Sequence, residues 1–414
     1  MSAQGPSGAA ADGKASSRPE RWLTPGVAAV GTASFLADAG HEVPTALLPS
    51  LVRNLGGSAS ALGLIEGVAD ALAGTARLVG GALADDPVRR QRVAVGGYAS
   101  TACLAAAIGA CSRVWQVGAL RAGAWAARGL RVPARNALLA DLVAPHAYGR
   151  AYGFERAMDN LGAIAGPLLA LGLVAAVGTR GAIALSVLPG LLAALAMVYA
   201  IRRAPSHEKR ERRPIRIRVR PVLQAGLGRL FGGVAAFEIA NVSTTLLILR
   251  ATELLEPGRG HDRATELAIA CYVLYNMAAT GISVPAGRVG DRWTPRPVLA
   301  GGVVMFGIAY VAFAIGGGLA MMATAFVLAG LGIGCVETAQ HAAVAAAAPP
   351  ALRGSAFGLL AAIQAGGNLV ASAVAGVIWT RASPSAAFGY LVACMVVAAV
   401  ALGRSTAGAP IRTP

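Results

Sequence analysis

The chain has 414 residues, of which 56% are hydrophobic and only 14% charged, and its mean hydropathy is +0.60. A soluble protein of this length needs much more charge to cover its surface, so the composition excludes a soluble globular protein. The net charge of +16 would suit a nucleic-acid binder, but the distribution of the basic residues along the chain speaks against that partner.

Residues 1–21 are rich in Ala, Gly and Ser and have no apolar core, which predicts a disordered cytoplasmic tail and not a cleavable signal peptide. The rest of the chain is nearly all apolar runs long enough to cross a bilayer as helices, separated by short polar breaks. We therefore expect an all-α membrane protein with twelve transmembrane helices, over residues 24–51, 59–84, 93–112, 114–138, 150–178, 181–201, 222–249, 266–286, 297–316, 319–345, 355–380 and 385–403.

The segment at residues 202–221 is too basic to be buried and divides the spans into two groups of six. We expect a six-helix N-terminal half at 22–201, this cytoplasmic linker, a six-helix C-terminal half at 222–404 and a cytoplasmic tail at 405–414. With twelve spans, 22 Lys and Arg lie on the side of both termini and 7 on the opposite side. This excess predicts a multi-pass protein of the cell inner (plasma) membrane with both termini in the cytoplasm. The basic balance thus reflects topology, and we expect no nucleic-acid partner.

Two charged loops half a chain apart share one pattern. In each, a Gly is followed four residues later by Asp and eight or nine residues later by Arg, namely Gly81, Asp85, Arg89 and Arg90 in the first loop and Gly287, Asp291 and Arg296 in the second. Arg292 follows Asp291 where the first loop has Asp86. The two glycines are 206 residues apart. A second repeat, Pro145 with Tyr152-Gly153 and Pro350 with Phe357-Gly358, has an offset of 205 residues. Two matches at nearly the same offset indicate a duplicated half, as in many secondary transporters.

These loops resemble those of the major facilitator superfamily, whose members carry such a loop between their second and third helices, and often between the eighth and ninth. The resemblance implies the superfamily fold of two pseudo-symmetric six-helix halves, with the two loops acting as a cytoplasmic gate. Three further stretches, at residues 128–141, 249–251 and 349–358, are similar to a prokaryotic branch of the same superfamily.

Span five contains the spaced residues Gly153, Gly162, Gly166 and Pro167, which look like the span-five motif of drug–proton antiporters in the superfamily. Glycines at helical spacing let helices approach closely, and a proline bends a helix by removing a backbone hydrogen bond. The motif favours export by antiport, and generic packing of small residues is the alternative explanation.

Ionisable side chains within membrane spans are costly and usually face a cavity or a partner. At about 100° per residue, the acids of span two share one face, and so do four arginines of span four. We expect the acidic faces of spans one and two to pack toward these arginines, which are Arg121, Arg128, Arg131 and Arg135. The residues that we expect to couple transport to protons are Asp38, Glu42, Glu66 and Asp70.

We expect the substrate to contact charged groups of the N-terminal half and mostly uncharged groups of the C-terminal half, which suit a binding surface. These residues are His41, Arg121, Arg128, Asn241, Tyr275, Asn276, Glu337 and His341. The two arginines either hold an anionic group or serve only as counter-ions, and the sequence leaves both open. Charges nearer the cytoplasmic ends are expected to hold helix ends together in one conformational state: Arg131, Arg135, Glu155, Arg156 and Asp159.

The leading hypothesis is a secondary active transporter that moves a small solute by alternating access, through proton-coupled efflux of a drug-like compound or metabolite. The alternatives are proton-coupled uptake of an anionic small metabolite, metal-ion transport, and a non-transporting membrane receptor. The sequence has no Walker-type phosphate loop, no triad context and no metal-ligand spacing, and its five cysteines are scattered. We therefore expect no enzymatic activity, no cofactor and no bound metal, in a monomer whose partners are its substrate, protons and the lipid bilayer.

Overall fold

The computed structural model describes residues 21–204 and 215–404, and every regular element within these ranges is a helix. The predicted terminal tails and the middle of the predicted linker lie outside the described residues. The helices of the N-terminal half are α1 (Pro25–Asn54), α2 (Ala59–Ala84), α3 (Pro87–Ala107), α4 (Val114–Leu142), α5 (Tyr148–Leu185) and α6 (Val187–Arg203). Two short 3-10 turns, Ile108–Ala110 and Pro145–Ala147, follow α3 and precede α5.

The C-terminal half begins with a short turn, α7 (Val219–Val222), and a π-helical segment, Leu223–Leu227. The remaining helices of this half are α8 (Gly228–Glu238), α9 (Thr244–Leu255), α10 (His261–Arg292), α11 (Pro295–Ile315), α12 (Leu319–Ala347), α13 (Arg353–Arg381) and α14 (Pro384–Arg404).

Local sequence explains where the first helices start. The hydroxyl of Thr24 accepts a hydrogen bond from the backbone N–H of Val27 at 3.3 Å, so Thr24 caps α1. Asp86 caps α3, where its carboxylate accepts from the N–H groups of Val88 and Arg89 at 2.9 and 3.2 Å. A proline, which has no N–H to satisfy, occupies the first position of each helix.

The prediction of one unbroken helix for span seven is wrong, because residues 239–243 separate α8 from α9. The backbone groups of this break bond to side chains of neighbouring helices. The Tyr310 hydroxyl donates to the carbonyl of Ala240 at 3.0 Å, and the Asn368 amide donates to the carbonyl of Asn241 at 2.8 Å. Non-helical backbone at membrane depth is tolerated when it is satisfied in this way.

The turn between spans five and six lies at Gly178, where the backbone adopts a φ of 72°. Only glycine reaches this region without strain. Residues 179–185 then form a short helical stretch, so α6 begins at Val187, six residues later than the expected start at 181.

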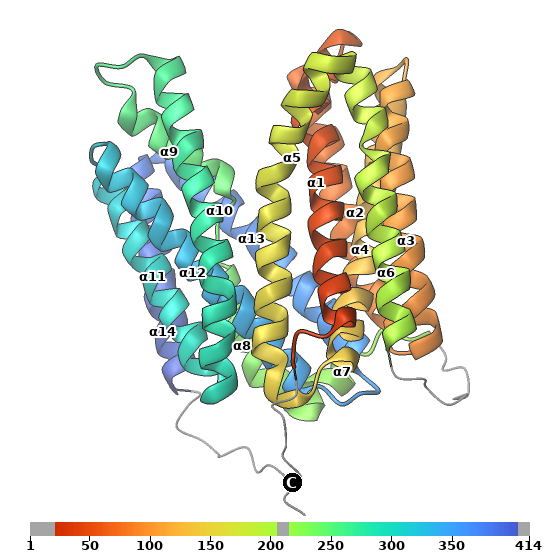
Figure 1. The fold of residues 1–414 in the computed structure, drawn as a ribbon. Helices are drawn as coiled ribbons and strands as arrows, with labels where there is room; N and C mark the ends of the chain where they lie inside the picture. The colour runs from red at the N-terminus through yellow and green to blue at the C-terminus, as the bar shows by residue number, and fades with distance from the viewer. Residues whose placement is uncertain (1–20, 205–214, 405–414) are drawn as a thin grey trace, which may run out of the picture.

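The described helices form twelve spans in two six-helix halves, as the sequence predicts (Figure 1). By length and composition alone, six of them are apolar enough to cross a membrane, namely α3, α5, α10, α11, α12 and α13. The other spans are short or broken, or they contain several charged residues, as in α1, α2 and α4. Composition alone therefore misses α1, α2 and α4, three of the helices that carry charged side chains into the interior.

The two halves meet at the end of the bundle where α6 stops and α7 starts, which we call the linker end (lower end in Figure 1). Here α5 packs against α10, and α2 packs against α13, so that each half contributes equivalent helices. Gly149 faces Gly287 across one contact, and Gly81 faces Gly354 and Gly358 across the other, with no room for a Cβ atom. Toward the opposite end, which we call the loop end, the two halves diverge (Figure 1).

The interiors of the two halves differ in character. One apolar cluster fills the C-terminal half, with phenylalanines of α8, α11, α12 and α14 at its centre. A second apolar cluster lies at the linker end and contains residues of both halves, including Leu138, Tyr152 and Phe357. The middle of the N-terminal half instead holds buried charged side chains. The polar centre of the molecule thus belongs mainly to α1, α2, α4 and α5.

Candidate functional site

The first charged loop closes the linker end by capping a helix of the other half. Asp85, at the end of α2, accepts hydrogen bonds from the backbone N–H of Ser355 at 2.8 Å and from its hydroxyl at 2.6 Å, in the first turn of α13. A carboxylate at a helix N-terminus satisfies free N–H groups and interacts favourably with the helix dipole. Burial raises the pKa of the Asp85 carboxyl, and the two hydrogen bonds from Ser355 act in the opposite direction.

The second loop makes the equivalent contact. Asp291, at the end of α10, accepts from the N–H groups of Gly149 and Arg150 at 2.6 and 3.1 Å, and from Nε of Arg150 at 2.7 Å, in the first turn of α5. Each half therefore caps a helix of the other half. We call these two contacts the crossed caps.

The arginines of the two loops have different surroundings. Arg90 is buried, donates to the carbonyl of Ala84 and pairs with Asp141, which also pairs with Arg353 of α13 at 3.2 Å. Arg89 lies 3.7 Å from Asp86 within its own loop. Arg292 and Arg296 are exposed, and the described residues show no ion pair for either of them. The acids of the two loops therefore make equivalent contacts, but the arginines do not.

A second cluster of charges lies where α4 and α5 cross. Arg135 of α4 pairs with Glu155 at 2.8 Å and with Asp159 at 3.4 Å. Arg156 pairs with the same two acids at 2.7 and 3.2 Å, and lies 3.9 Å from Glu337 of the C-terminal half. Two arginines thus neutralise the enclosed Glu155 and the partly exposed Asp159, and attract a third acid from α12 across the interface between the halves.

A third cluster combines α1, α4 and α5 at the centre of the bundle, and we call it the central cluster. Arg128 donates to Asp38 at 3.1 Å and to Nε2 of His41 at 2.7 Å. Glu42 lies 3.3 Å from the same ring nitrogen. The carboxyl group of Asp159 lies next to that of Asp38, so α5 contributes a third acid to this cluster.

A fourth cluster lies nearer the loop end. Arg121 pairs with Glu66 at 3.0 Å, donates to the hydroxyl of Thr45 and stacks on the ring of Trp125 at 3.5 Å. The indole N–H of Trp125 donates to Asp70 at 2.9 Å. The acids of α1 and α2 thus face the arginines of α4, as the helical periodicity predicts. Arg121 is only 1% exposed and is held as a counter-ion, whereas Arg128 is 29% exposed.

The residues expected to bind substrate in the C-terminal half do not form one surface. Tyr275 and Asn276 are buried, with Tyr275 stacked on Tyr272 and the Asn276 amide donating to the carbonyl of Tyr272. His341 is also buried, where it contacts the rings of Tyr152 and Phe357. Helical spacing shows which face of a span carries a polar side chain. It does not show whether that face contacts the other half of the molecule or neighbouring helices of the same half.

Glu337 and Asn241 do lie at the inner face of the half, and Asn241 belongs to a network that the sequence analysis missed. Its amide donates to the buried carboxyl of Glu238 at 3.0 Å. The amide of Gln340 also donates to Glu238, at 3.3 Å, and in turn accepts from Gln364 at 2.9 Å. The described residues show no ion pair for Glu238. The only signal in the sequence is the cluster of polar residues at 238–243, which coincides with the break between α8 and α9.

The span-five glycines lie at helix contacts. Gly162 packs on the carbonyl of Phe35 beside Asp38, and Gly166 packs on Glu42, so both bring α5 against the acidic face of α1. Gly153 packs on the carbonyl of Ser283 in the other half. Pro167 lies within α5 and directly follows Gly166. This is the close packing that the small residues predict, placed beside the acids expected to carry protons.

The described residues contain no group of three or more His, Cys, Asp or Glu side chains arranged to hold a metal ion. What they do contain is a set of partly exposed acids around one partly exposed arginine, between two six-helix halves joined at one end. This combination defines a two-domain membrane transporter.

Comparison with known proteins gives the family. The sequence model of the Major Facilitator Superfamily matches residues 30–254 and 259–410, and the chain belongs to this superfamily. It is 28% identical over 380 residues to an uncharacterised MFS-type transporter of Methanocaldococcus jannaschii, which covers 90% of this chain and 92% of that protein. The expected family and fold are therefore confirmed, and membership points to a secondary transporter in a membrane rather than an enzyme.

Two solved structures share the fold. A bacterial homologue of the iron transporter ferroportin, in an outward-facing state, has a TM-score of 0.73 and 17% identity, with 92% of this chain and 100% of that chain covered. The human organic anion transporter TETRAN has a TM-score of 0.71 and 17% identity, with 91% and 99% covered. At this identity the similarity concerns the fold alone.

Proposed function

We propose that this transporter exports a small solute across the inner (plasma) membrane in exchange for protons, by alternating access. The observation that carries the proposal is the central cluster. Its two neighbouring carboxyl groups, Asp38 and Asp159, lie beside Arg128, whose side chain is 29% exposed. An acid pair next to a mobile cation can hold a proton in one state and release it in another.

The solvent exposure of the acids in and around the central cluster supports a role in proton transfer. The side chains of Glu42, Asp159 and Glu337 lie mid-span, yet they are between 22% and 30% exposed. Among the described residues, the polar contacts between the halves lie from this level toward the linker end, and the halves diverge toward the loop end (Figure 1). With the basic linker in the cytoplasm, as its charge predicts, the conformation is outward-facing, and the cluster receives protons from outside.

In our proposal, Arg128 is the switch between proton and substrate. While Asp38 is ionised, the guanidinium pairs with it at 3.1 Å. Protonation of the acid pair weakens this attraction and leaves Arg128 and the neighbouring Glu42 free to change partners. A bound solute that competes for the same acids then promotes release of the proton on the opposite side. The solute is exchanged for a proton because the acids are stabilised by the proton in one state and by the solute in the other.

The balance of accessible charge favours a cationic or weakly basic solute. Three partly exposed acids surround the site, against one partly exposed arginine. The uptake of an anionic metabolite would rest on Arg128 alone, since Arg121 is enclosed by Glu66 and Trp125. This alternative keeps the same fold and the same cluster but predicts a different class of solute.

The test uses proteoliposomes that contain the full-length protein and carry an imposed pH gradient, followed with a pH-sensitive dye. We expect a cationic solute from a panel to collapse the gradient in the wild type, and Asp38→Asn to abolish this response. Asp262→Asn, at an exposed position of α10, is the matched control and should behave as the wild type. Equal proton flux in Asp38→Asn would remove this acid from the mechanism, and a response to organic anions alone would favour the uptake alternative.

A further inference from the structure

One arginine of α4 has no acidic partner. Arg121 pairs with Glu66, Arg128 with Asp38, and Arg135 with two acids of α5, but the described residues show no ion pair or hydrogen bond for Arg131. Its side chain is only 2% exposed, and its Nε and one terminal nitrogen have no partner. The contact that it does make is with the ring of Tyr98, 3.9 Å from the guanidinium carbon. A buried charge without a counter-charge is strongly destabilising.

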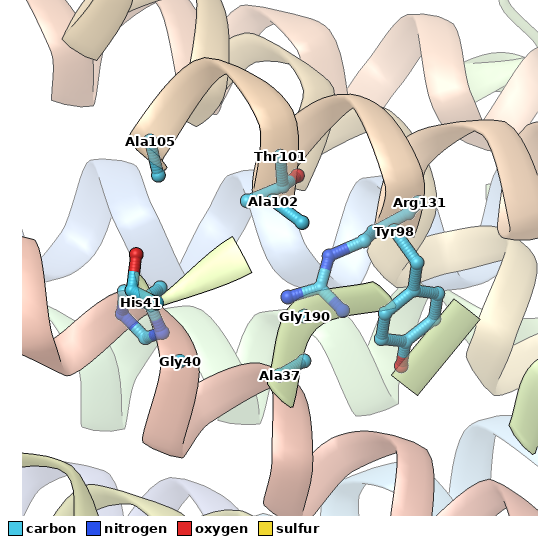
Figure 2. Close-up of a pocket in the computed structure, with 10 residues that line it drawn as sticks. Ala37, Gly40, His41, Tyr98, Thr101, Ala102, Ala105, Arg131 and Gly190 are labelled. Atoms are coloured by element: carbon cyan, nitrogen blue, oxygen red, sulfur yellow. The ribbon is translucent and has the colours of Figure 1, made fainter. Parts of the chain in front are cut away.

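The guanidinium of Arg131 lies at a small internal cavity between α1, α3, α4 and α6 (Figure 2). In Figure 2 it lies between the imidazole of His41 on one side and the ring of Tyr98 on the other. The cavity has a volume of about 10 Å³, which is about the space that one water molecule needs. The rest of its wall is formed by small residues, among them Gly40, Ala102 and Gly190.

The wall of this cavity offers donors and no carboxylate. Nε2 of His41 accepts from Arg128, because an arginine can only donate, so a neutral His41 carries its proton on Nδ1. That Nδ1 lies 3.2 Å from Asp38 but makes no hydrogen bond in the described structure. The Tyr98 hydroxyl is likewise unpartnered. The hydroxyls of Thr101 and Ser186 donate their protons to backbone carbonyls of their own helices.

The geometry points to a binding site for one small monovalent anion, a halide such as chloride, in the cavity between Arg131, His41 and Tyr98. A single negative charge there neutralises Arg131 and accepts hydrogen bonds from its guanidinium and from the Tyr98 hydroxyl, which make none in the described structure. The volume excludes carboxylates, phosphates and other polyatomic anions. The site lies inside the N-terminal half, between α1, α3, α4 and α6, and shares His41 with the central cluster.

An anion at this position stabilises the packing of α1 on α3, α4 and α6. It also removes the repulsion that Arg131 exerts on Arg128 and Arg135, the neighbouring arginines of the same helix face. The three remaining arginines of α4 then keep their own acids. We therefore expect halide to act on the stability of the N-terminal half.

The first measurement is thermal unfolding of the purified full-length protein in lipid nanodiscs, in sodium chloride or sodium bromide against sodium gluconate at equal ionic strength. We expect the halide salts to raise the unfolding midpoint by about 2–4 °C in a saturable manner. Arg131→Gln should lose this dependence, and Arg113→Gln, at an exposed arginine of the loop end, should retain it. A midpoint that is the same in halide and gluconate would overturn the proposal.

Tyr98→Phe provides a second variant in case Arg131→Gln does not fold, because it removes only the hydroxyl and keeps the ring beneath the guanidinium. We expect it to require several-fold more halide for the same stabilisation. Crystals grown in bromide should show an anomalous peak in the cavity that persists in Arg128→Gln. A peak at Arg128 alone, or a cavity that holds only water, contradicts an anion site at Arg131.

Discussion

At the scale of single residues, the four arginines of α4 differ in exposure although they share one helix face. Arg121 and Arg135 are enclosed and paired with acids, Arg131 is enclosed without an ion pair, and of these four arginines only Arg128 is partly accessible. An enclosed pair fixes two helices together, whereas an accessible arginine can exchange its partner. The same residue type thus performs two tasks that depend on what surrounds it.

This difference gives a paired prediction for Arg121 and Arg128. Arg121→Gln leaves the partly exposed Glu66 without its partner and removes the stacking on Trp125, so we expect a loss of about 1.5–3 kcal/mol of stability. Arg128→Gln should abolish transport with a much smaller change in the unfolding midpoint. Thermal unfolding in nanodiscs and flux in proteoliposomes measure the two effects. The reverse pattern would make Arg121 the substrate contact.

The sequence predicts the charged residues of the site better than the uncharged ones. A charge in a membrane span must find a partner, so the acids of α1 and α2 could be matched to the arginines of α4 from their spacing alone. Tyr275, Asn276 and His341 carry no such requirement, and each proves to be buried within packing. Asp159 was expected to hold helix ends together near the cytoplasmic side. It does pair with Arg135 and Arg156, but it also lies next to Asp38. Their proximity depends on how closely α5 approaches α1, which spacing along one helix does not define.

At the scale of helices, that approach depends on the glycines of α5. Gly162 and Gly166 each pack directly on the backbone or first side-chain atoms of α1, between Phe35 and Glu42. Small residues at such a contact allow helices in a membrane to come within van der Waals distance of each other's backbones. The motif was recognisable in the sequence, but its partner helix was not. The break between α8 and α9 was missed for a related reason, since it is stabilised by Tyr310 and Asn368 of distant helices.

Gly162→Ala tests this contact. A Cβ atom at this position would lie 2.6 Å from the carbonyl oxygen of Phe35, so α5 must move away from α1. We expect a destabilisation of about 1–3 kcal/mol, together with reduced proton-coupled flux because Asp38 and Asp159 separate.

Gly172→Ala, on the same helix, is the control. A Cβ atom there meets nothing within 4 Å, so this variant should be neutral or stabilised by up to about 1 kcal/mol. The measurements are the unfolding midpoint and flux in proteoliposomes. If both variants behave alike, close packing at Gly162 has no role in the site.

At the scale of the whole molecule, the repeat in the sequence predicts two halves but not which end holds them together. The structure shows the closed end to be the linker end, where the crossed caps, the glycine contacts and a shared apolar cluster coincide. The loop-end halves of the same helices have no equivalent contacts among those described. Alternating access therefore requires the linker-end contacts to break, with the crossed caps as the polar part of what is lost.

Asp291→Asn tests the caps. An amide in place of the carboxylate loses the charge-assisted bonds to the start of α5, each worth roughly 1.5–3 kcal/mol. We expect the linker end to open about tenfold more often. The readout is the rate at which a thiol reagent labels Ser283→Cys, a buried position of α10 that faces Gly153, in a background without other cysteines.

The matched control is again Asp262→Asn, whose carboxylate is exposed at the loop end. It should leave the labelling rate unchanged. An unchanged rate in Asp291→Asn as well would mean that the apolar contacts at the linker end are sufficient to keep it closed.

The crossed caps have the arrangement of an isologous dimer interface, in which one patch contacts the equivalent patch of a second copy. The acid after α2 caps α13, and the acid after α10 caps α5, the helix that corresponds to α13 in the other half. A half-length chain with one such acid and one such helix would form this contact twice when it dimerises with a second copy. In such a dimer a single change in the loop alters both contacts at once, whereas in this chain each cap can change separately.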